Sequence, residues 1–74
     1  MPKITPISPY NLEKIILELG FQKVRQKGAH VFYSHADGRN TTIPFHGNRE
    51  IGPVLIKMIL KEINLSREEY QSYL

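Results

Sequence analysis

A histidine stands directly after a glycine turn in this chain, and a basic segment precedes that turn. The turn is Gly28-Ala29, the histidine is His30, and the basic side chains occupy alternate positions at Lys23, Arg25 and Lys27. Histidine takes up and releases a proton near neutral pH, because its ordinary pKa is roughly 6.5. Arginine and lysine bind phosphate groups. The pattern therefore favours acid–base chemistry on a phosphodiester, and RNA is the expected substrate.

RNA can be cleaved when a base takes the proton of a ribose 2′-hydroxyl, the oxygen attacks the adjacent phosphorus, and cations stabilise the added negative charge. We expect His30 to be that base, with no metal and no other cofactor. Contacts with RNA are expected from Lys23, Arg25, Lys27 and Gly28. The residues alone leave a plain surface histidine and a solvated strand face open as alternatives. The proton donor to the leaving group stays open among water, Tyr33 and a lysine.

A metal site built from His30, His35 and His46 is a further alternative, since neutral imidazoles bind zinc or nickel. We expect no such site, because the strand registers place His30 and His35 on different faces. His35 is expected at a strand end that borders the turn at Asp37-Gly38. His46 is expected to order the loop that follows Pro44.

Composition sets the class of protein. A chain of 74 residues predicts one domain over residues 1–74, with a shallow site on a face rather than a deep pocket. The absence of cysteine excludes disulfides and Cys-containing zinc sites, and the net charge of +3 favours an anionic partner. No apolar run approaches the roughly 18 residues of a membrane span, and the segment Met1–Pro6 lacks the apolar core of a secretory signal. A cytoplasmic protein with no membrane partner is expected.

In the first half of the chain, the spacing of apolar residues changes at Phe21 from a helical repeat to alternation. Ser8-Pro9 is typical of a helix start and Gly20 of a helix stop, so that a helix is predicted over residues 9–19. From Phe21 alternation predicts a strand, and Gly28-Ala29 fits a two-residue hairpin turn that pairs Lys27 with His30.

The predicted register assigns side chains to two faces of a sheet. One face is expected to carry His30, Phe32 and Ser34 together with Lys23, Arg25 and Lys27. The other is expected to carry Val24, Val31 and Tyr33. A three-residue loop at Ala36–Gly38 then returns Ile43 to the face of Val31 and Tyr33, and Pro44 ends the third strand. Phe32 is placed to stack on a base or to cover the sheet.

The second half of the chain predicts two helices. Gly52-Pro53 opens the first, with a core stripe at Ile56, Ile59, Leu60 and Ile63 and surplus apolar side chains at Leu55 and Met58. Ser66–Glu69 is a capping box that starts a short terminal helix ending near Tyr73. The predicted fold is α+β: a helix, a three-stranded antiparallel sheet and a helix, followed by a short C-terminal helix. Two helices then cover one face of the sheet and leave the basic face open.

A set of short motifs recurs here in a characteristic order: Leu19-Gly20-Phe21, Lys27-Gly28-Ala29-His30, Tyr33 with His35, Asp37-Gly38, Ile43-Pro44-Phe45-His46, Glu50-Ile51 with Pro53, Lys57, Ile59-Leu60 and Leu65-Ser66. Through these motifs nearly the whole chain resembles the HicA family of small toxins from bacterial and archaeal toxin-antitoxin pairs. The resemblance implies a fold like that of double-stranded-RNA-binding domains, used as a ribonuclease that cleaves mRNA. It also implies that His30 is the catalytic residue and that a HicB-type antitoxin binds and masks the site.

Two positions depart from the family pattern. Ala29 replaces the serine that often lies between the glycine and the histidine, so any contact of that hydroxyl with RNA is absent. Val54 and Leu55 replace the glycine and threonine that often open the second helix. Two other functions remain open: a non-catalytic RNA-binding module that uses the same basic strand, and a purely protein-binding partner.

Overall fold

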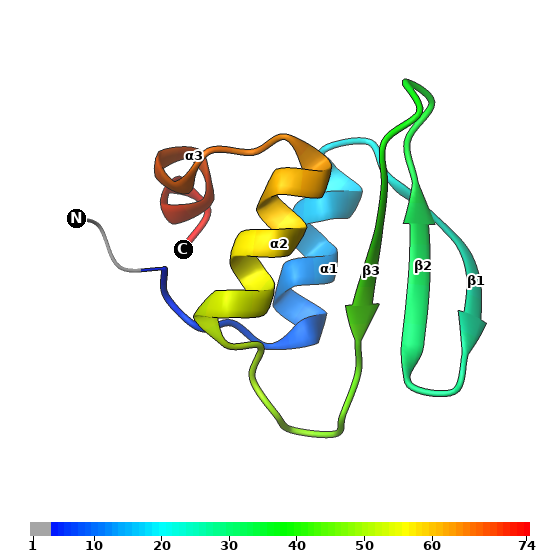
Figure 1. Ribbon diagram of the computed structural model, residues 1–74, viewed down its shortest axis with the longest axis horizontal. Coiled ribbons are helices and arrows are strands. Elements are labelled where there is room, and N and C mark those ends of the chain that lie inside the picture. The colour runs from blue at the N-terminus through cyan, green and yellow to red at the C-terminus, as the bar shows by residue number, and fades with distance from the viewer. Residues whose placement is uncertain (1–3) are drawn as a thin grey trace.

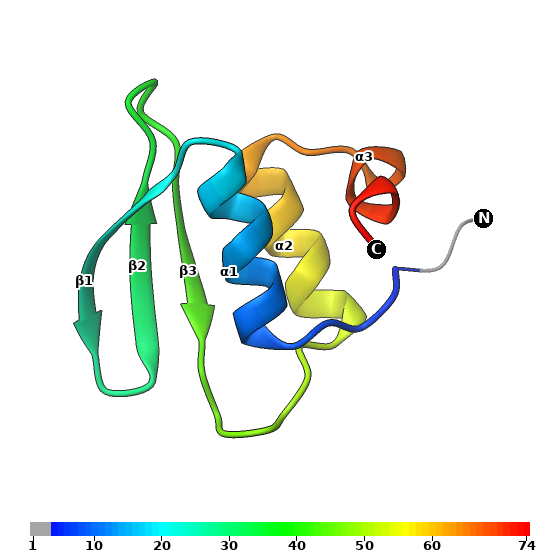
Figure 2. The ribbon, with the colours of Figure 1, turned by 180° about the vertical axis from the view of Figure 1, so that it is seen from behind.

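Two layers make up the computed structural model, which describes residues 4–74 (Figure 1). Its elements are α1 (Pro9–Glu18), β1 (Gln22–Lys27), β2 (His30–Ser34), β3 (Asn40–Pro44), α2 (Pro53–Ile63) and α3 (Arg67–Ser72). The strands form an antiparallel sheet in the order β1-β2-β3, and α1 and α2 cover one of its faces (Figures 1 and 2). The predicted α+β fold is confirmed. The segment Met1–Pro6 is expected to lack the apolar core of a secretory signal. Its residues 1–3 lie outside the part of the chain that the structure describes.

The helices begin and end where the sequence predicts. The Ser8 hydroxyl accepts a hydrogen bond from the backbone N–H of Asn11 at 3.2 Å, and Pro9 occupies the first helical position of α1. Gly20 follows the last turn at a φ of +98°, a value that favours glycine. The capping box at the start of α3 is also formed, since Ser66 and Glu69 each bind the other's backbone N–H at 3.0 Å.

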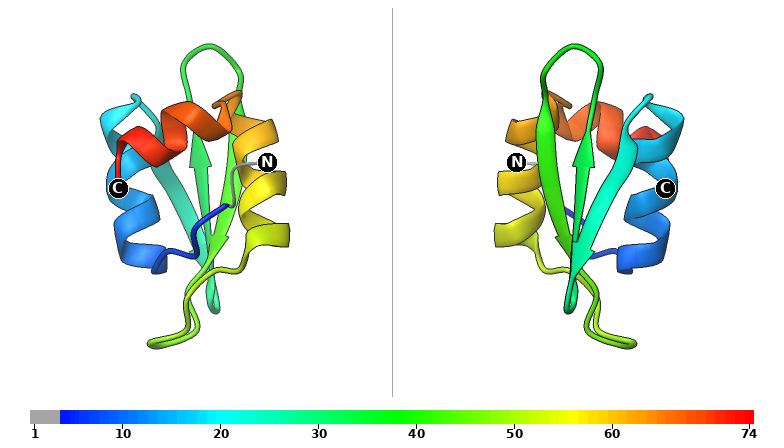
Figure 3. Two further views of the ribbon diagram at one scale, coloured as in Figure 1. Left: turned by 90° about the vertical axis from the view of Figure 1, so that its left-hand side faces the viewer. Right: turned by 90° about the vertical axis from the view of Figure 1, so that its right-hand side faces the viewer.

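The core lies between the sheet and the helices, and α3 closes its far side by crossing α1 and α2 (Figure 3). Its members are the buried apolar residues Ile4, Ile7, Leu12, Ile15, Ile16, Phe21, Val31, Tyr33, Ile43, Ile51, Ile56, Ile59, Leu60, Ile63 and Tyr70. Ile7 and Ile51 also pair their backbones, with the N–H of Ile51 donating to the carbonyl of Ile7 at 2.7 Å. This bridge ties the N-terminal segment to the segment before α2.

The second hairpin has the predicted register, and the first has it from the turn as far as the pair of Arg25 with Phe32. Lys27 pairs with His30 across the first turn, where Gly28 has a φ of +58°. Val31 pairs with Ile43 across the second, and Gly38 takes a φ of +98° in the three-residue loop. Both Val31 and Ile43 are buried beneath the helices, as expected. The turns therefore fix which side chains of β2 face away from the core.

One part of the predicted face assignment is wrong. Lys23 pairs with Tyr33 whereas Arg25 pairs with Phe32, so the register shifts at Val24. Such a β-bulge places one extra residue in one strand and inverts the alternation on one side of it. Lys23 therefore shares the helix-covered face with Tyr33, and Val24 is 58% exposed instead of joining the core.

The described residues contain no helix that is both long enough and apolar enough to cross a membrane.

Candidate active site on the open face of the sheet

The right-hand view of Figure 3 shows the face of the sheet that α1 and α2 leave uncovered, called the open face here. This face carries a cation above an aromatic ring. The guanidinium carbon of Arg25 lies 4.7 Å from the centre of the Phe32 ring. These two residues are cross-strand partners, and every residue of β1 is exposed. The half-buried Phe32 ring with a cation against it offers a stacking surface for a base and a positive charge for a phosphate.

His30 lies at the edge of this face, at the first position of β2. It is exposed, and its cross-strand partners are Lys27 on β1 and Pro44 on β3. The turn beside it is open, because a Cβ added at Gly28 would meet no atom within 4 Å. The structure thus brings His30, Lys27, Gly28 and Arg25 to one surface, as predicted, with Lys27 the nearest basic partner in the ladder.

A second histidine reaches the same place. The ring of His46 lies 6.2 Å from that of His30, centre to centre, with the ring planes at 83°. Both rings are exposed. His46 was expected only to order the loop after Pro44, and this pairing was not predicted. The sequence carried part of the signal, since Pro44 pairs with His30 and a residue two positions further along an extended chain returns to the same side. That the chain stays extended beyond Pro44 depends on contacts of Phe45 with distant residues.

The third histidine lies apart and has a structural role. In His35, Nε2 lies 3.1 Å from the carbonyl oxygen of Leu19, and Nδ1 accepts from the backbone N–H of Asp37 at 3.1 Å. A neutral ring with its proton on Nε2 satisfies both contacts. The ring also packs on Phe21, and a Cβ at Gly20 would stand 2.9 Å from Nε2. His35 therefore joins the end of α1 to the second hairpin, at the strand end where it was expected.

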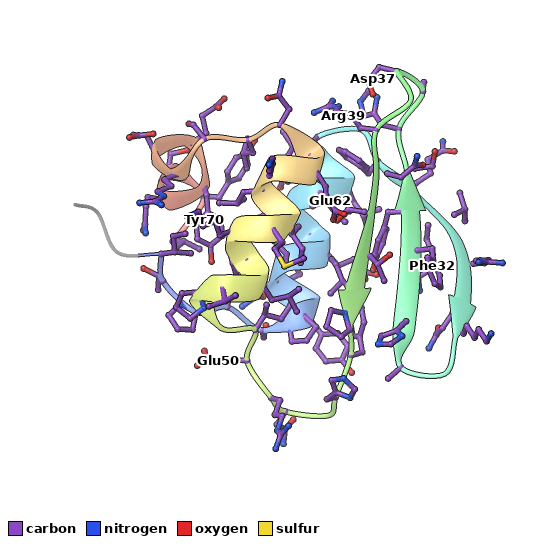
Figure 4. The ribbon with its side chains drawn as sticks, in the orientation of Figure 1. Phe32, Asp37, Arg39, Glu50, Glu62 and Tyr70 are labelled. Atoms are coloured by element: carbon purple, nitrogen blue, oxygen red, sulfur yellow. The ribbon has the colours of Figure 1, made fainter. Side chains whose placement is uncertain are left out.

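The same hairpin uses its charges internally, as Figure 4 shows for Asp37 and Arg39. The Nε of Arg39 donates to Asp37 at 2.8 Å, and another guanidinium nitrogen donates to the carbonyl of Ile63. Burial acts to raise the pKa of Asp37, but the hydrogen bonds and charge of Arg39, with a smaller contribution from His35, bring it below its ordinary value. The Arg39 guanidinium is therefore bound to α2 and to the turn.

Tyr33 faces the core and is removed as a proton donor for chemistry at His30. It is 1% exposed, and its hydroxyl donates a hydrogen bond to the Glu13 carboxylate on α1. Burial, and then Glu13, raise the pKa of the Tyr33 phenol. Lys23 lies on this same side, with its Nζ 4.0 Å from Glu13. The tyrosine and Lys23 therefore form part of a cluster beneath the sheet.

A shallow, largely apolar groove runs from His30 to the second helix; it is called the α2 groove below. Its lining comes from β2, β3 and α2: His30, Phe32, Thr42, Pro44, Leu55, Met58, Ile59 and Glu62. Glu62 lies toward β3 in Figure 4, where its carboxylate accepts from the Thr41 hydroxyl at 2.9 Å. Leu55 and Met58, predicted as surplus apolar residues of α2, thus continue the surface on which His30 lies.

Within residues 4–74, no three His, Cys, Asp or Glu side chains gather into a group that would hold a metal ion. The chemistry that the open face offers comes from imidazole rings and fixed cations. Imidazole transfers protons, and guanidinium and ammonium groups stabilise the charge of a phosphoryl transition state.

A family model described as the HicA toxin of bacterial toxin-antitoxin matches residues 10–65. The matched region runs from α1 to just beyond α2 and contains both His30 and His46. A search among curated proteins finds no match.

Proposed function

Because the chain belongs to the HicA family of toxins from bacterial toxin-antitoxin pairs, we propose that it is an endoribonuclease that cleaves mRNA, with His30 as the catalytic base. The enzyme acts without a metal and works in the cytoplasm, where mRNA is translated. The observation that carries the proposal is the position of His30, exposed on the open face with Lys27 as its cross-strand partner and Arg25 on the same face.

The reaction follows from the groups at this surface. His30 takes the proton of the 2′-hydroxyl, the oxygen forms a bond to the adjacent phosphorus, and the bond from phosphorus to the 5′-oxygen breaks. Lys27 and Arg25 stabilise the charge that builds on the non-bridging oxygens. The products are a 2′,3′-cyclic phosphate and a 5′-hydroxyl end.

RNA binding is proposed for the surface formed by Arg25, Lys27, Gly28 and Phe32. Arg25 and Lys27 contact phosphates, the Phe32 ring stacks on a base, and the Gly28 turn allows the RNA backbone to approach closely because no side chain stands there. Lys23, which was also expected to bind RNA, lies on the other face beside Glu13 and is not part of the proposed surface.

An antitoxin partner follows from the family, and we propose that a HicB-type antitoxin covers the α2 groove. The groove is apolar and continuous with His30, so a protein seated in it would also block RNA from the catalytic base. Exposed apolar side chains at Val54 and Met58 extend the same surface along α2.

The experiment that tests the proposed function is an RNA-cleavage assay in EDTA on the wild type and on His30→Ala. We expect the wild type to cleave and the variant to lose at least about 100-fold in rate, the lower end of the effect of a general base. Asn48→Ala, an exposed change in the loop after β3, is the matched control. Circular dichroism on each protein shows that the fold is kept.

Other outcomes favour the competing function. Wild-type protein that binds RNA in a salt-sensitive manner without cleaving it would show a non-catalytic RNA-binding module on the same face. Cleavage that EDTA stops, or that His30→Ala leaves unchanged, would contradict the proposed mechanism.

A further inference from the structure

We propose that His46 is the general acid of the reaction, which donates a proton to the 5′-oxygen as it leaves. The inference rests on the proposed function and adds a second catalytic residue to it. Its basis is the pairing of two exposed imidazole rings, 6.2 Å apart between centres, at the edge of the open face.

Contacts of the residues before His46 and a turn after it hold His46 in this position. Pro44 pairs with His30, and the backbone N–H of the next residue, Phe45, donates to the carbonyl of Ala29 at 2.6 Å. The Phe45 ring packs edge-on against Tyr10 of α1 at 5.1 Å. With Phe45 fixed toward the helices, the following side chain emerges on the side of His30. A turn at Gly47, where φ is +60° and the N–H of Arg49 donates to the His46 carbonyl, then leads the chain away.

The chemistry needs a group at such a position. When the 2′-oxygen attacks phosphorus, the proton passes to His30 and the 5′-oxygen leaves from the opposite side of the phosphorus. An alkoxide is a poor leaving group, so a proton delivered to that oxygen lowers the barrier. If His46 is protonated at the start, its proton completes the 5′-hydroxyl, and the pair ends with His30 protonated and His46 neutral. Protons and electron pairs balance with no other reactant.

The spacing of the rings fits a phosphate between them. The attacking and leaving oxygens each lie about 3 Å from their proton-transfer partner in a productive complex. Two ring nitrogens that hold a phosphoryl group between them are therefore several ångströms apart. The two ring centres are separated by a distance of that size. Both side chains are exposed and free to rotate as the substrate enters.

Other donors near His30 fit less well. The Tyr33 hydroxyl donates a hydrogen bond to Glu13 beneath the sheet, and His35 is bound between Leu19 and Asp37. Lys27 is adjacent, but a lysine ammonium is a much weaker acid than an imidazolium and serves better as a fixed charge. Among residues 4–74, His46 is the imidazole that stands against the catalytic base.

The test uses an RNA whose cleaved linkage, mapped first with the wild type, carries sulfur in place of the bridging 5′-oxygen. A thiolate leaves without help from an acid, because a thiol is far more acidic than an alcohol. On ordinary RNA we expect His46→Ala to lose about 100-fold or more in rate. On the thio-substituted RNA we expect it to cleave at close to the wild-type rate, while His30→Ala stays inactive on both substrates.

Each other outcome is decisive. His46→Ala that cleaves ordinary RNA like the wild type would overturn the proposal, as would an equal loss on both substrates, which indicates a positioning role. A wild type that cleaves neither RNA would overturn the proposed function itself. Asn48→Ala controls for the loop, and His46→Gln, which keeps a polar side chain, replaces His46→Ala if circular dichroism shows that the alanine variant is unfolded.

Discussion

Arg25 has two functions at the level of the single residue. Its guanidinium packs on the Phe32 ring, which orders both groups, and its charge remains available to a phosphate. Lys27 contributes a more mobile charge next to His30. Because nucleic-acid affinity depends on counterions released by each phosphate contact, these two residues should determine how salt weakens binding of RNA to the proposed surface.

Neutralising either cation of the open face should weaken RNA binding and make it less sensitive to salt. For Arg25→Gln and for Lys27→Gln we expect the slope of log affinity against log salt to become shallower by about 0.7, the value for one contact to a single strand. The measurement is a salt titration of affinity with a fluorescent RNA, on the His30→Ala background to prevent cleavage.

Lys14→Gln on α1 is the matched control for loss of one charge. Lys23→Gln should behave like this control, because Lys23 lies beneath the sheet beside Glu13. A loss at Lys23 as large as that at Lys27 would contradict the assignment of the open face.

The sequence predicted that His30 lies beside Lys27 and Gly28, but not that it lies beside His46. His30, Gly28 and Lys27 are neighbours in the chain, so that a two-residue turn brings them together by local geometry. The contact with His46 depends on the path of the chain beyond Pro44. That path is fixed by the hydrogen bond from Phe45 to Ala29 and by packing on Tyr10, which no local pattern specifies.

At the level of the element, α2 serves two surfaces. Its core stripe is buried as predicted, at Ile56, Ile59, Leu60 and Ile63. Val54 and Met58, one turn apart on its outer side, are 80% and 58% exposed. A contiguous exposed apolar patch on a small protein is often a partner site. The helix therefore holds the sheet on one side, and on the other it lines the α2 groove, where we propose that the antitoxin binds.

A charge in the α2 groove should weaken binding of the proposed antitoxin. For Met58→Glu we expect affinity for the proposed HicB-type antitoxin to fall by at least about tenfold, the effect of losing a strong interface contact. Leu17→Glu, at an exposed apolar position of α1, is the matched control. The measurement is inhibition of RNA cleavage by added antitoxin. Equal inhibition of Met58→Glu and the wild type would place the antitoxin elsewhere.

The strands show where sequence reasoning reaches its limit. Alternation from Phe21 to Lys27 predicted β1 and its basic character, and both are present. The alternation of residues does not predict the bulge at Val24, because an edge strand tolerates a lysine or a valine on either face of the sheet. Burial of Tyr33 against Glu13 favours a register in which Lys23 also approaches that carboxylate.

The whole molecule is too thin to enclose its site. Its principal extents are 34, 29 and 17 Å, and a chain of this size buries only about 60% of its surface. The proposed chemistry must therefore take place on a face, where RNA or a protein could reach it. The overall fold was predictable because turns, caps and apolar spacing all indicate the same two layers. The bridge of Ile7 to Ile51 was not, since it joins distant segments with no periodic signal.

Buried tyrosines should make the fold sensitive to alkaline pH. Burial, and then Glu13, raise the pKa of Tyr33, while burial, and then Glu50, raise that of Tyr70, which Figure 4 shows between α3 and α2. The neutral phenols are favoured in the folded state. Their contribution is thus complete below the ordinary tyrosine pKa of about 10 and is lost as pH rises above it.

Urea unfolding at a series of pH values measures this effect. The free energy of unfolding of the wild type should fall above about pH 10, and it should fall less steeply for Tyr33→Phe, in which only the Tyr70 contribution remains. The lysines deprotonate in both proteins and so do not affect the comparison. Equal slopes would show that Tyr33 ionises as easily in the folded state as in the unfolded chain.

The most direct test of the mechanism is the identity of the ends that the wild type leaves on RNA cleaved in EDTA. Attack by the 2′-hydroxyl, with His30 as base, predicts a 2′,3′-cyclic phosphate on one fragment and a 5′-hydroxyl on the other. Mass spectrometry of the fragments distinguishes these ends. A 5′-phosphate with a free 3′-hydroxyl would show that water or another external nucleophile attacks the phosphorus, and would contradict the role given to His30.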